Sequence, residues 1–447
     1  MSFPKDFIWG AASSAYQTEG ACSEDGKGMS IWDSFCRQEG VIVNGENGDI
    51  ACDAYHRFAE DIALMKQMGL KAYRFSLSWP RILPSGRGTV NERGFLFYDK
   101  LVDMLLDNGI EPIITLFHWD MPLALHEQGG WLGRDIVSAF EEYSAVVARH
   151  FAGRVKTYIP LNELQCFVSL GYERGLHAPG YKLPLKDVFT CILHSLLAQG
   201  RSIMALRENS PANIKIGVAS TGRLCYPKND TPKGCEAAEK SSFVVSGFDW
   251  LFSHNLFLDP LVWGRFPKCD IEGFDELAYA VSSEDWQVIQ QSVDFIGLNV
   301  YNGREVDDDG VDVKKIPGFA RTALKWPITP KVMRFGPRFV YNRYRLPLMI
   351  SENGQSCNDR VYLDGQVHDT DRIDFLHSYI SELKKACADG VPISGYLHWS
   401  LTDNFEWHNG YDERFGLIFI NYETQQRMAK DSARWYANVI ASNGQFL

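Results

Sequence analysis

The chain has 447 residues, of which 45% are hydrophobic and 23% are charged, so it can form a large globular core. Its net charge of −11 argues against a nucleic-acid partner, and no run of about 18 apolar residues could span a membrane. Ten cysteines without a CxxC motif and an N-terminus without a visible signal peptide favour reduced cysteines and a cytoplasmic location.

Short runs of apolar and β-branched residues recur along the chain and predict strands. They cover 6–12, 71–78, 111–119, 155–163, 214–220, 293–301, 346–354 and 393–401. Most of these runs alternate little between polar and apolar residues. This pattern is typical of parallel strands that are covered on both faces.

Helical patterns lie between the predicted strands. In 53–68, apolar residues recur at spacings of three and four, and Gly69 follows as a stop signal. Similar patterns cover 94–109, 135–151, 187–207, 282–291, 371–389 and 431–442, whereas 233–265 is longer and mixed. We interpret 302–345 as a loop insertion in which the acidic stretch VDDDGVD forms a solvated turn, with a calcium site as the weaker alternative.

Strand and helix therefore alternate about eight times, which requires parallel strands joined by crossover helices. The predicted fold is α/β, a single (β/α)₈ TIM barrel with elaborated βα loops. An open, doubly wound sheet is the alternative. No linker rich in Pro, Gly or Ser interrupts the chain, so we expect one catalytic domain over 1–447.

Polar and aromatic residues gather where the predicted strands end, which is where such barrels place their sites. They are Arg74, His118, Trp119, Asn162, Glu163, Asn299, Tyr301, Glu352, Asn353 and Trp399, followed by Glu406 and Trp407. Glu163 and Glu352 on different strands suit glycoside hydrolysis, in which one carboxyl protonates the leaving oxygen and the other attacks the anomeric carbon or activates water. We expect no cofactor. We also expect no metal, because His118 lacks partners at ligand spacing.

Several of these residues also have a structural interpretation. Glu163 could cap the helix that follows it, and Arg74 could pair with a buried carboxylate. Trp399 and Trp407 could be core residues, and His118 could be a structural histidine. His177 could border the entrance of the site.

The chain resembles the family 1 glycoside hydrolases, the β-glucosidase family, over essentially its whole length. The matching blocks are FPKDFIWGAASSAYQTEG, YRFSLSWPRILP, LFHWDMPLAL, GYERGLHAPG, DFIGLNVY, ISENG and HWSLTDNFEWHNGYDERFGL. The resemblance implies a retaining β-glycosidase that works by double displacement, with Glu352 as the nucleophile and Glu163 as the general acid/base. It implies that the sugar pocket contains Gln17, His118, Trp119, Asn162, Trp399, Glu406, Trp407 and Phe415, that Arg74, Asn299 and Tyr301 surround the nucleophile, and that Trp326 faces the leaving group.

The expected substrates are small β-glycosides with terminal glucosyl residues, and galactosyl or fucosyl residues as further options. Cellobiose, short cello-oligosaccharides and aryl glucosides belong to this class, which suggests a role in cellulose degradation. Intact Glu406 and Trp407 favour an unphosphorylated sugar, and Glu163 argues against the thioglucosidase branch. A non-catalytic sugar binder and an enzyme that prefers glycosyl transfer are the alternatives, and the sequence leaves the oligomeric state open.

The chain also departs from the family pattern. Leu164 stands where the family usually has Pro, which puts the pose and acidity of Glu163 in question. Val300 replaces a frequent Tyr, and Lys325 and Pro327 replace the usual Gly and Glu beside Trp326, which puts the leaving-group preference in question. We expect burial and the charge of Glu352 to raise the pKa of Glu163, and Arg74 and Tyr301 to keep Glu352 ionised.

Overall fold

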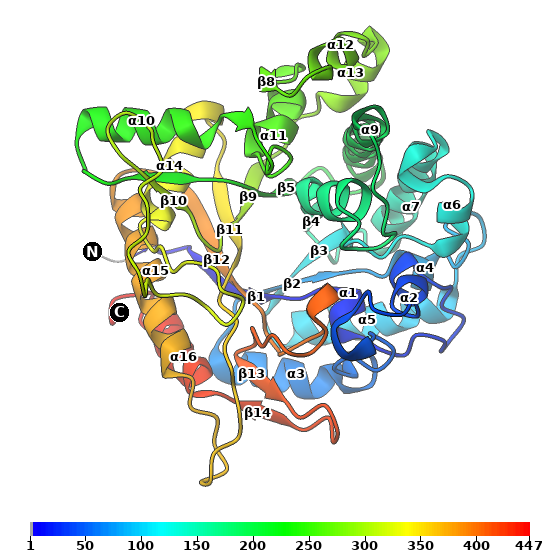
Figure 1. Ribbon diagram of the computed structural model, residues 1–447. Helices are drawn as coiled ribbons and strands as arrows, with labels where there is room; N and C mark the ends of the chain where they lie inside the picture. The colour runs from blue at the N-terminus through cyan, green and yellow to red at the C-terminus, as the bar shows by residue number, and fades with distance from the viewer. Residues whose placement is uncertain (1–2) are drawn as a thin grey trace.

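The computed structural model describes residues 3–447, so the first two residues of the expected domain lie outside the described part. Eight parallel strands close into a barrel in the order β1, β2, β3, β4, β5, β9, β11, β12, with β12 pairing back onto β1 (Figure 1). Their bounds are β1 Ile8–Ala12, β2 Ala72–Ser76, β3 Glu111–Phe117, β4 Thr157–Leu161, β5 Lys215–Thr221, β9 Phe295–Asn299, β11 Leu348–Asn353 and β12 Ile393–Trp399. The predicted (β/α)₈ barrel is confirmed, and the alternative of an open sheet is wrong.

Helices surround these strands in Figure 1, which explains why nearly every strand residue is buried. The longer helices are α3 Ala54–Met68, α5 Glu92–Asp107, α7 Asp135–His150, α9 Leu185–Asn209, α10 Pro232–Ser242, α11 His254–Trp263, α14 Val332–Tyr344, α15 Thr370–Ala388 and α16 Asp431–Ala441. Gly69 ends α3 as predicted, with a φ of 76° that L-residues rarely adopt. Segment 233–265 resolves into α10 and α11.

The interpretation of 302–345 as a loop insertion is wrong for its last part, from Val332 to Tyr344. That part forms α14, which packs against α15. Gly336 and Pro337 lie inside this helix and weaken the helical signal of the sequence. The stretch VDDDGVD does form a turn, in which the Asp307 carboxylate accepts hydrogen bonds from the backbone N–H groups of Asp309 and Val311, each at 3.0 Å.

Shorter elements build the loops. They are α1 Ala15–Thr18, α2 Ile31–Phe35, α4 Trp79–Ile82, α6 Leu123–Glu127, α8 Leu164–Val168, α12 Phe274–Tyr279, α13 Ser283–Ile289, β6 Cys225–Pro227, β7 Val245–Ser246, β8 Cys269–Asp270, β10 Arg304–Val306, β13 Ile418–Ile420 and β14 Arg427–Ala429. One-turn helices complete them at η1 Val43–Gly45, η2 Gly130–Leu132, η3 Ser169–Glu173 and η4 Trp407–Asn409. Most of these elements follow a strand, so they stand at the end of the barrel where the site is expected.

The barrel interior is a small core separate from the larger one between strands and helices. It consists of Ala12, Ala72, Ile113, Ile159, Ala219, Phe295, Met349, Leu397, Trp399 and Phe415. Small side chains on some strands leave room for Phe295 and Met349 from the others, as in other packed barrels. Trp399 and Phe415 belong both to this interior core and to the lining of the cavity described below, so the cavity has a rigid floor.

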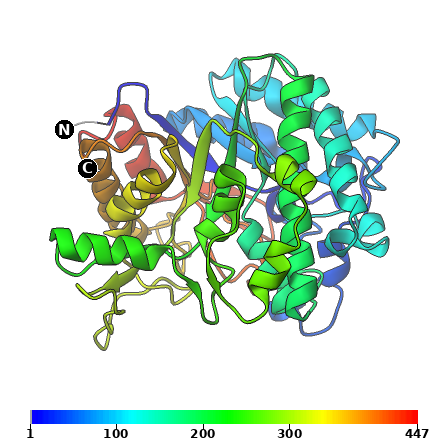
Figure 2. The same cartoon turned by 90° about the horizontal axis from the view of Figure 1, so that it is seen from above.

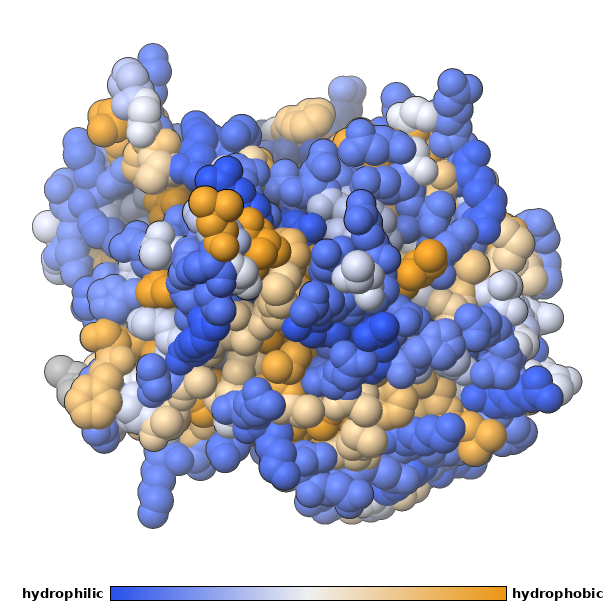
Figure 3. Space-filling model, turned by 90° about the horizontal axis from the view of Figure 1, so that it is seen from below, coloured by the Kyte–Doolittle hydropathy of each residue, from blue (hydrophilic) through white to orange (hydrophobic). Residues whose placement is uncertain are grey.

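The C-terminus lies close to the first described residues of the chain in both Figure 1 and Figure 2. Asn443 joins the two segments, because its side-chain amide donates hydrogen bonds to the carbonyls of Phe3 and Pro4 at 3.1 and 3.0 Å. Hydrophilic residues cover most of the face seen in Figure 3, with hydrophobic residues between them in separate groups. Within residues 3–447, no helix is long and apolar enough to cross a membrane.

Candidate active site

A cavity of about 280 Å³ opens at the carboxyl ends of the barrel strands. It contains most of the residues that the sequence singled out, namely His118, Trp119, Asn162, Glu163, Tyr301, Trp326, Glu352, Trp399, Glu406, Trp407 and Phe415. Gln17, Arg74 and Asn299 do not line this cavity, but each donates a hydrogen bond to a residue that does. The volume and the mixture of aromatic and polar walls suit a small ligand such as one sugar ring.

Glu163 follows β4 and stands at the N-cap position of α8. Its side chain makes no capping hydrogen bond, so the capping interpretation is right about the position and wrong about the carboxyl group. The backbone N–H of Glu163 instead donates to the carbonyl of Ala219 on β5, at 3.0 Å. The side-chain amide of Asn299 donates to its Oε1 at 2.7 Å, which directs the carboxyl group into the cavity.

Glu352 lies on β11, and both of its carboxyl oxygens are held. Arg74 Nη1 donates to Oε1 at 2.6 Å, and the Tyr301 hydroxyl donates to Oε2 at 2.6 Å. Arg74 is fully buried and also donates to Asn162 Oδ1 at 2.6 Å. Arg74 therefore pairs with a buried carboxylate, as its structural interpretation expects, and that carboxylate belongs to Glu352.

The surroundings of the two glutamates separate their acidities. Burial, and then the negative charge of Glu352, raise the pKa of Glu163 to about 7. Burial also raises the pKa of Glu352, but the charge of Arg74 and the hydrogen bond from Tyr301 oppose this rise. Because the cation contacts Glu352, the proton of the pair resides on Glu163. The site thus presents a proton donor beside a carboxylate at neutral pH.

Glu406 is a third carboxyl group in the cavity. Burial raises its pKa to about 8, and the charges of Glu413, Glu352 and Glu163 add to this effect. Gln17 lies behind it, because its side-chain amide donates to the Phe405 carbonyl at 2.9 Å and to Glu406 Oε2 at 3.4 Å. Among the described residues, no lysine or arginine lines this cavity.

His118 is neutral and stacks between two tryptophans. Its ring centroid lies 5.6 Å from that of Trp399 and 5.9 Å from that of Trp407, with nearly parallel planes. Burial and the charge of Arg74 hold its pKa well below the ordinary range. Asn162 Oδ1 already accepts from Arg74 and Asn299, so its amide nitrogen donates to His118 Nε2 at 3.1 Å. The proton of the imidazole is therefore on Nδ1, which has no partner within residues 3–447.

The tryptophans belong to the core and to the cavity at once. Trp399 and Trp407 are each 4% exposed, and both line the cavity. Trp119 Nε1 donates to the Asn162 carbonyl at 2.9 Å, and its ring packs 4.5 Å from that of Trp407. The core interpretation is therefore right for these residues, and their place in the cavity wall is compatible with the sugar-platform interpretation, which stays a prediction.

Trp326 stands beside Tyr301, with ring centroids 5.4 Å apart. The residue before it, Lys325, has a φ of 65°, in the left-handed region that favours glycine. This backbone conformation explains why a glycine is the usual residue at that position. Lys325 adopts it here within a turn closed by its N–H, which donates to the Thr322 carbonyl at 2.9 Å.

Several cavity residues were absent from the sequence prediction. They are Cys166, Leu170, Leu324, His408 and Asn409, and His177, expected only at the entrance, lines the cavity as well. The spacing of Cys166, three residues after Glu163 on the same helix, was a usable signal. His408 and Asn409 directly follow Trp407 in η4, so they could also have been found. Leu170 and Leu324 carry no chemical signal.

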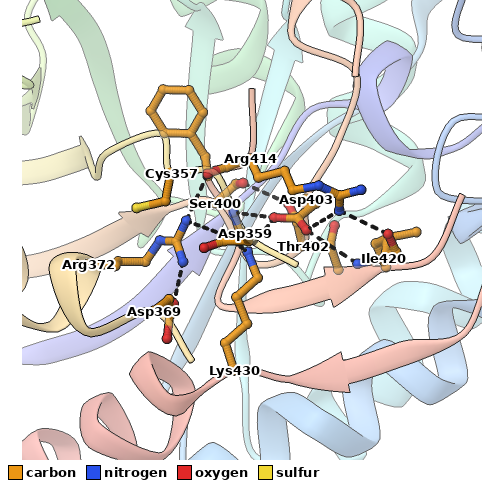
Figure 4. Close-up of polar contacts among 12 residues, drawn as sticks. Cys357, Asp359, Asp369, Arg372, Ser400, Thr402, Asp403, Arg414, Ile420 and Lys430 are labelled. Atoms are coloured by element: carbon orange, nitrogen blue, oxygen red, sulfur yellow. Dashed lines mark hydrogen bonds and ion pairs between the residues drawn. The ribbon is translucent and has the colours of Figure 1, made fainter. Parts of the chain in front are cut away.

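A buried network of charges supports the loop that carries Glu406 and Trp407 (Figure 4). Lys430 is fully buried and donates to Asp359 at 2.5 Å and to Asp403 at 2.6 Å. Asp403 also accepts from Arg414 at 2.7 Å and from the backbone N–H of Gly416 at 3.0 Å. These bonds join Asp403, which precedes Glu406, to Arg414 and Gly416, which follow Trp407. The network therefore positions Glu406 without contacting the cavity.

Comparison with known proteins agrees with this geometry. The family model described as glycosyl hydrolase family 1 matches residues 1–445. β-Glucosidase A of Thermotoga maritima is 40% identical over 450 residues, covering 99% of this chain and 98% of its own, and the aryl-phospho-β-D-glucosidase of Bacillus subtilis is 39% identical over 481 residues, covering 100% and 98%. The solved structure of the β-glucosidase from Thermotoga maritima in complex with glucoimidazole superposes with a TM-score of 0.91, at 40% identity and 99% coverage of both chains.

Proposed function

Since the chain belongs to glycosyl hydrolase family 1, whose members hydrolyse glycosides with retention of configuration, we propose that it is a β-glucosidase. It removes terminal, non-reducing β-D-glucosyl residues, and also galactosyl and fucosyl residues, from aryl glycosides, cellobiose and short cello-oligosaccharides. A place in the breakdown of cellulose follows from the last two substrates. A cytoplasmic location is part of this proposal, and the ten free cysteines support it.

The observation that carries the proposal is the different support of two carboxyl groups in one cavity. Glu352, held by Arg74 and Tyr301, attacks the anomeric carbon while Glu163 gives its proton to the leaving oxygen. The glycosidic C–O bond breaks, and a covalent glycosyl ester forms on Glu352. The ester carries no charge, so the pKa of Glu163 falls, and Glu163 then takes a proton from the water that releases the sugar.

The proposed sugar is unphosphorylated. A phosphate group in the cavity would face Glu163, Glu352 and Glu406, and no lysine or arginine among the described lining residues would neutralise it. Glu406 and the Nδ1–H of His118 instead supply hydrogen-bonding groups for hydroxyls, and Gln17 holds Glu406 in place from behind. Among solved structures, the β-glucosidase of Thermotoga maritima in complex with galacto-hydroximolactam is 40% identical, which supports acceptance of a galactosyl residue.

Steady-state kinetics with matched chromogenic substrates tests this proposal. We expect the highest kcat/KM for 4-nitrophenyl β-D-glucoside or its galactosyl or fucosyl counterpart, and release of glucose from cellobiose. The 6-phosphate of the same glucoside should react at least 100-fold more slowly. A preference for the phosphorylated substrate would contradict the proposal, as would binding without turnover.

A further inference from the structure

A second cavity, of about 430 Å³, adjoins the first one at the proposed acid/base. Glu163, Tyr301 and Trp326 line both cavities. If Glu163 protonates the leaving oxygen, the leaving group must extend from it away from the sugar cavity, and this second cavity occupies that space. The inference below therefore rests on the proposed function.

Aromatic and charged residues line different parts of this second cavity. Trp326 and Phe252 supply aromatic surface, while Arg223, Arg304 and Asp249 supply charge. The volume is within the range of pockets for small organic ligands and exceeds that of the sugar cavity. A planar ring with polar substituents fits both the size and the chemistry of such walls better than a purely apolar group.

The charges at this cavity do not cancel. Asp249 accepts from Arg304 at 3.1 Å and from Arg174 at 3.2 Å, and Arg304 lies 3.4 Å from Asp312. Arg223 has no carboxylate partner within residues 3–447. One of its nitrogens donates to the Val244 carbonyl, and its Nε is buried without a partner in the same residues. Arg223 therefore offers an uncompensated positive charge at the wall of the cavity.

We propose that this second cavity selects leaving groups that are aromatic and carry a carboxylate, with Arg223 as the specificity-determining residue. The guanidinium group binds the carboxylate by a charge-assisted hydrogen bond from a donor that the Val244 carbonyl leaves free. Trp326 packs against the ring. The preferred substrates are therefore β-glycosides of hydroxylated aromatic acids, within the class of aryl glycosides that the enzyme is proposed to hydrolyse.

The test compares two substrates that differ in charge and hardly in size, 4-carboxyphenyl and 4-carbamoylphenyl β-D-glucoside. We expect the wild-type protein to favour the carboxylate about 10-fold in kcat/KM. Arg223→Gln should bring this ratio close to one, and Arg223→Lys should keep part of it. The difference in reactivity of the two phenols cancels when the ratios of the variants are compared with that of the wild type.

Arg149→Gln is the matched control, because it removes the same charge from an exposed arginine at the end of α7, next to the start of β4 and away from the cavity. It should leave the ratio unchanged. Salt provides a readout that needs no variant. Raising NaCl from 50 to 500 mM should increase KM for the carboxylate substrate and leave KM for the amide substrate unchanged.

Three outcomes would overturn the inference. If the ratio of kcat/KM for the carboxylate substrate to that for the amide substrate were equal in wild type and Arg223→Gln, Arg223 would not recognise the carboxylate. If Arg223→Gln lowered kcat/KM equally for cellobiose and for the carboxylate substrate, the cavity would bind sugar hydroxyls instead. A KM for the carboxylate substrate that does not change with salt would contradict it even if Arg223→Gln failed to fold. Failure of the proposed function itself would look different, because the wild type would cleave neither substrate.

Discussion

Glu163 and Glu352 have the same side chain, and their neighbours assign them different proton occupancies. Glu352 contacts Arg74 and Tyr301, whereas Glu163 receives one hydrogen bond from the neutral amide of Asn299. A shift of one pKa unit corresponds to about 1.4 kcal/mol, so a few contacts of this kind suffice to separate the roles of two identical groups. The contacts of single residues therefore determine which glutamate donates the proton and which one attacks.

Replacing Glu163 by Gln tests the role of the proton donor. The folded pKa is raised to about 7, so the protonated form is present below pH 7 and is lost as the pH rises through that value. The kcat/KM of Glu163→Gln for glucosides with poor leaving groups should fall by about 10²–10⁴-fold, and the basic limb of its pH profile should disappear. An unchanged rate that still declines near pH 7 would show that another group supplies the proton.

Replacing Tyr301 by Phe tests how Glu352 is kept ionised. The hydroxyl donates to the carboxylate at 2.6 Å and lowers its pKa, so its removal should raise that pKa and move the acidic limb of kcat/KM to higher pH. A hydrogen bond to a charged group contributes about 1.5–3 kcal/mol, which corresponds to a loss of roughly 10- to 100-fold at the optimum. A profile of kcat/KM from pH 4 to 9 gives both the position of the acidic limb and the loss at the optimum. An acidic limb that stays in place would remove Tyr301 from the support of Glu352.

Single residues with a strong chemical signature were the easiest part of the site to predict. Glu, His and Trp at the ends of predicted strands led directly to Glu163, Glu352 and Trp399. Leu170 and Leu324 line the same cavity but look like any core residue in the sequence. The charges of Arg223 and Lys430 were visible, but whether each has a carboxylate partner could be identified only in three dimensions. Lys430 pairs with Asp359 across 71 positions of sequence, whereas Arg223 has no carboxylate partner within residues 3–447.

At the scale of elements, the connection from β4 to α8 determines how Glu163 is presented. The backbone of Glu163 pairs with Ala219 of β5, and its side chain is held by Asn299 of β9. Neither contact involves Leu164, which occupies the first position of α8. A proline is well tolerated at such a position. The departure from the family proline therefore leaves the support of Glu163 intact.

Leu164→Pro tests this conclusion. The basic limb of kcat/KM should stay within about 0.3 pH units of the wild type, because the neighbours that set the pKa of Glu163 do not change. Activity at the optimum should remain within about threefold. Thermal unfolding of the same samples serves as a control for folding. A well-folded variant with a displaced basic limb would show that residue 164 does control the pose of Glu163.

The strands were more predictable than the helices. Strands buried on both faces read as continuous apolar runs. Seven of the eight predicted runs contain one barrel strand each, and the run 214–220 covers all of β5 except Thr221. α14 was missed because Gly336 and Pro337 interrupt its pattern and because tertiary packing against α15 stabilises it. The extents of loops such as 302–331 depend on contacts between distant segments, which a single sequence does not contain.

At the scale of the whole molecule, closure of the barrel brings residues from distant parts of the chain into one buried site. Burial affects the stability of the protein as well as its chemistry. His254, at the start of α11, is fully buried, and burial lowers its pKa to about 4. A histidine in the unfolded chain titrates near 6.5. The neutral form is therefore favoured by the fold.

This shift gives stability a defined pH dependence. Because the folded pKa is depressed, the contribution of His254 is fully present above about pH 6.5 and is lost as the pH falls toward 4. As the pH falls from 7.5 to 5, the loss of this contribution should lower the free energy of unfolding by about 2 kcal/mol. Urea titrations at both pH values give the decrease in the free energy of unfolding for the wild type and for His254→Gln. The difference between the two decreases is the contribution of His254. Equal losses in both proteins would mean that His254 is not held neutral.

The central claim is that Glu352 is the nucleophile that forms the covalent bond and that Glu163 is the general acid and base. Rescue of variants by azide tests both roles. Each glutamate is replaced by Ala, an activated aryl β-D-glucoside is supplied with sodium azide, and the anomeric configuration of the product is determined by NMR. In Glu352→Ala, azide should attack in place of the missing nucleophile and give the α-glucosyl azide. In Glu163→Ala, azide should release the sugar from Glu352 and give the β-glucosyl azide. The opposite configurations would contradict the assignment of the two glutamates.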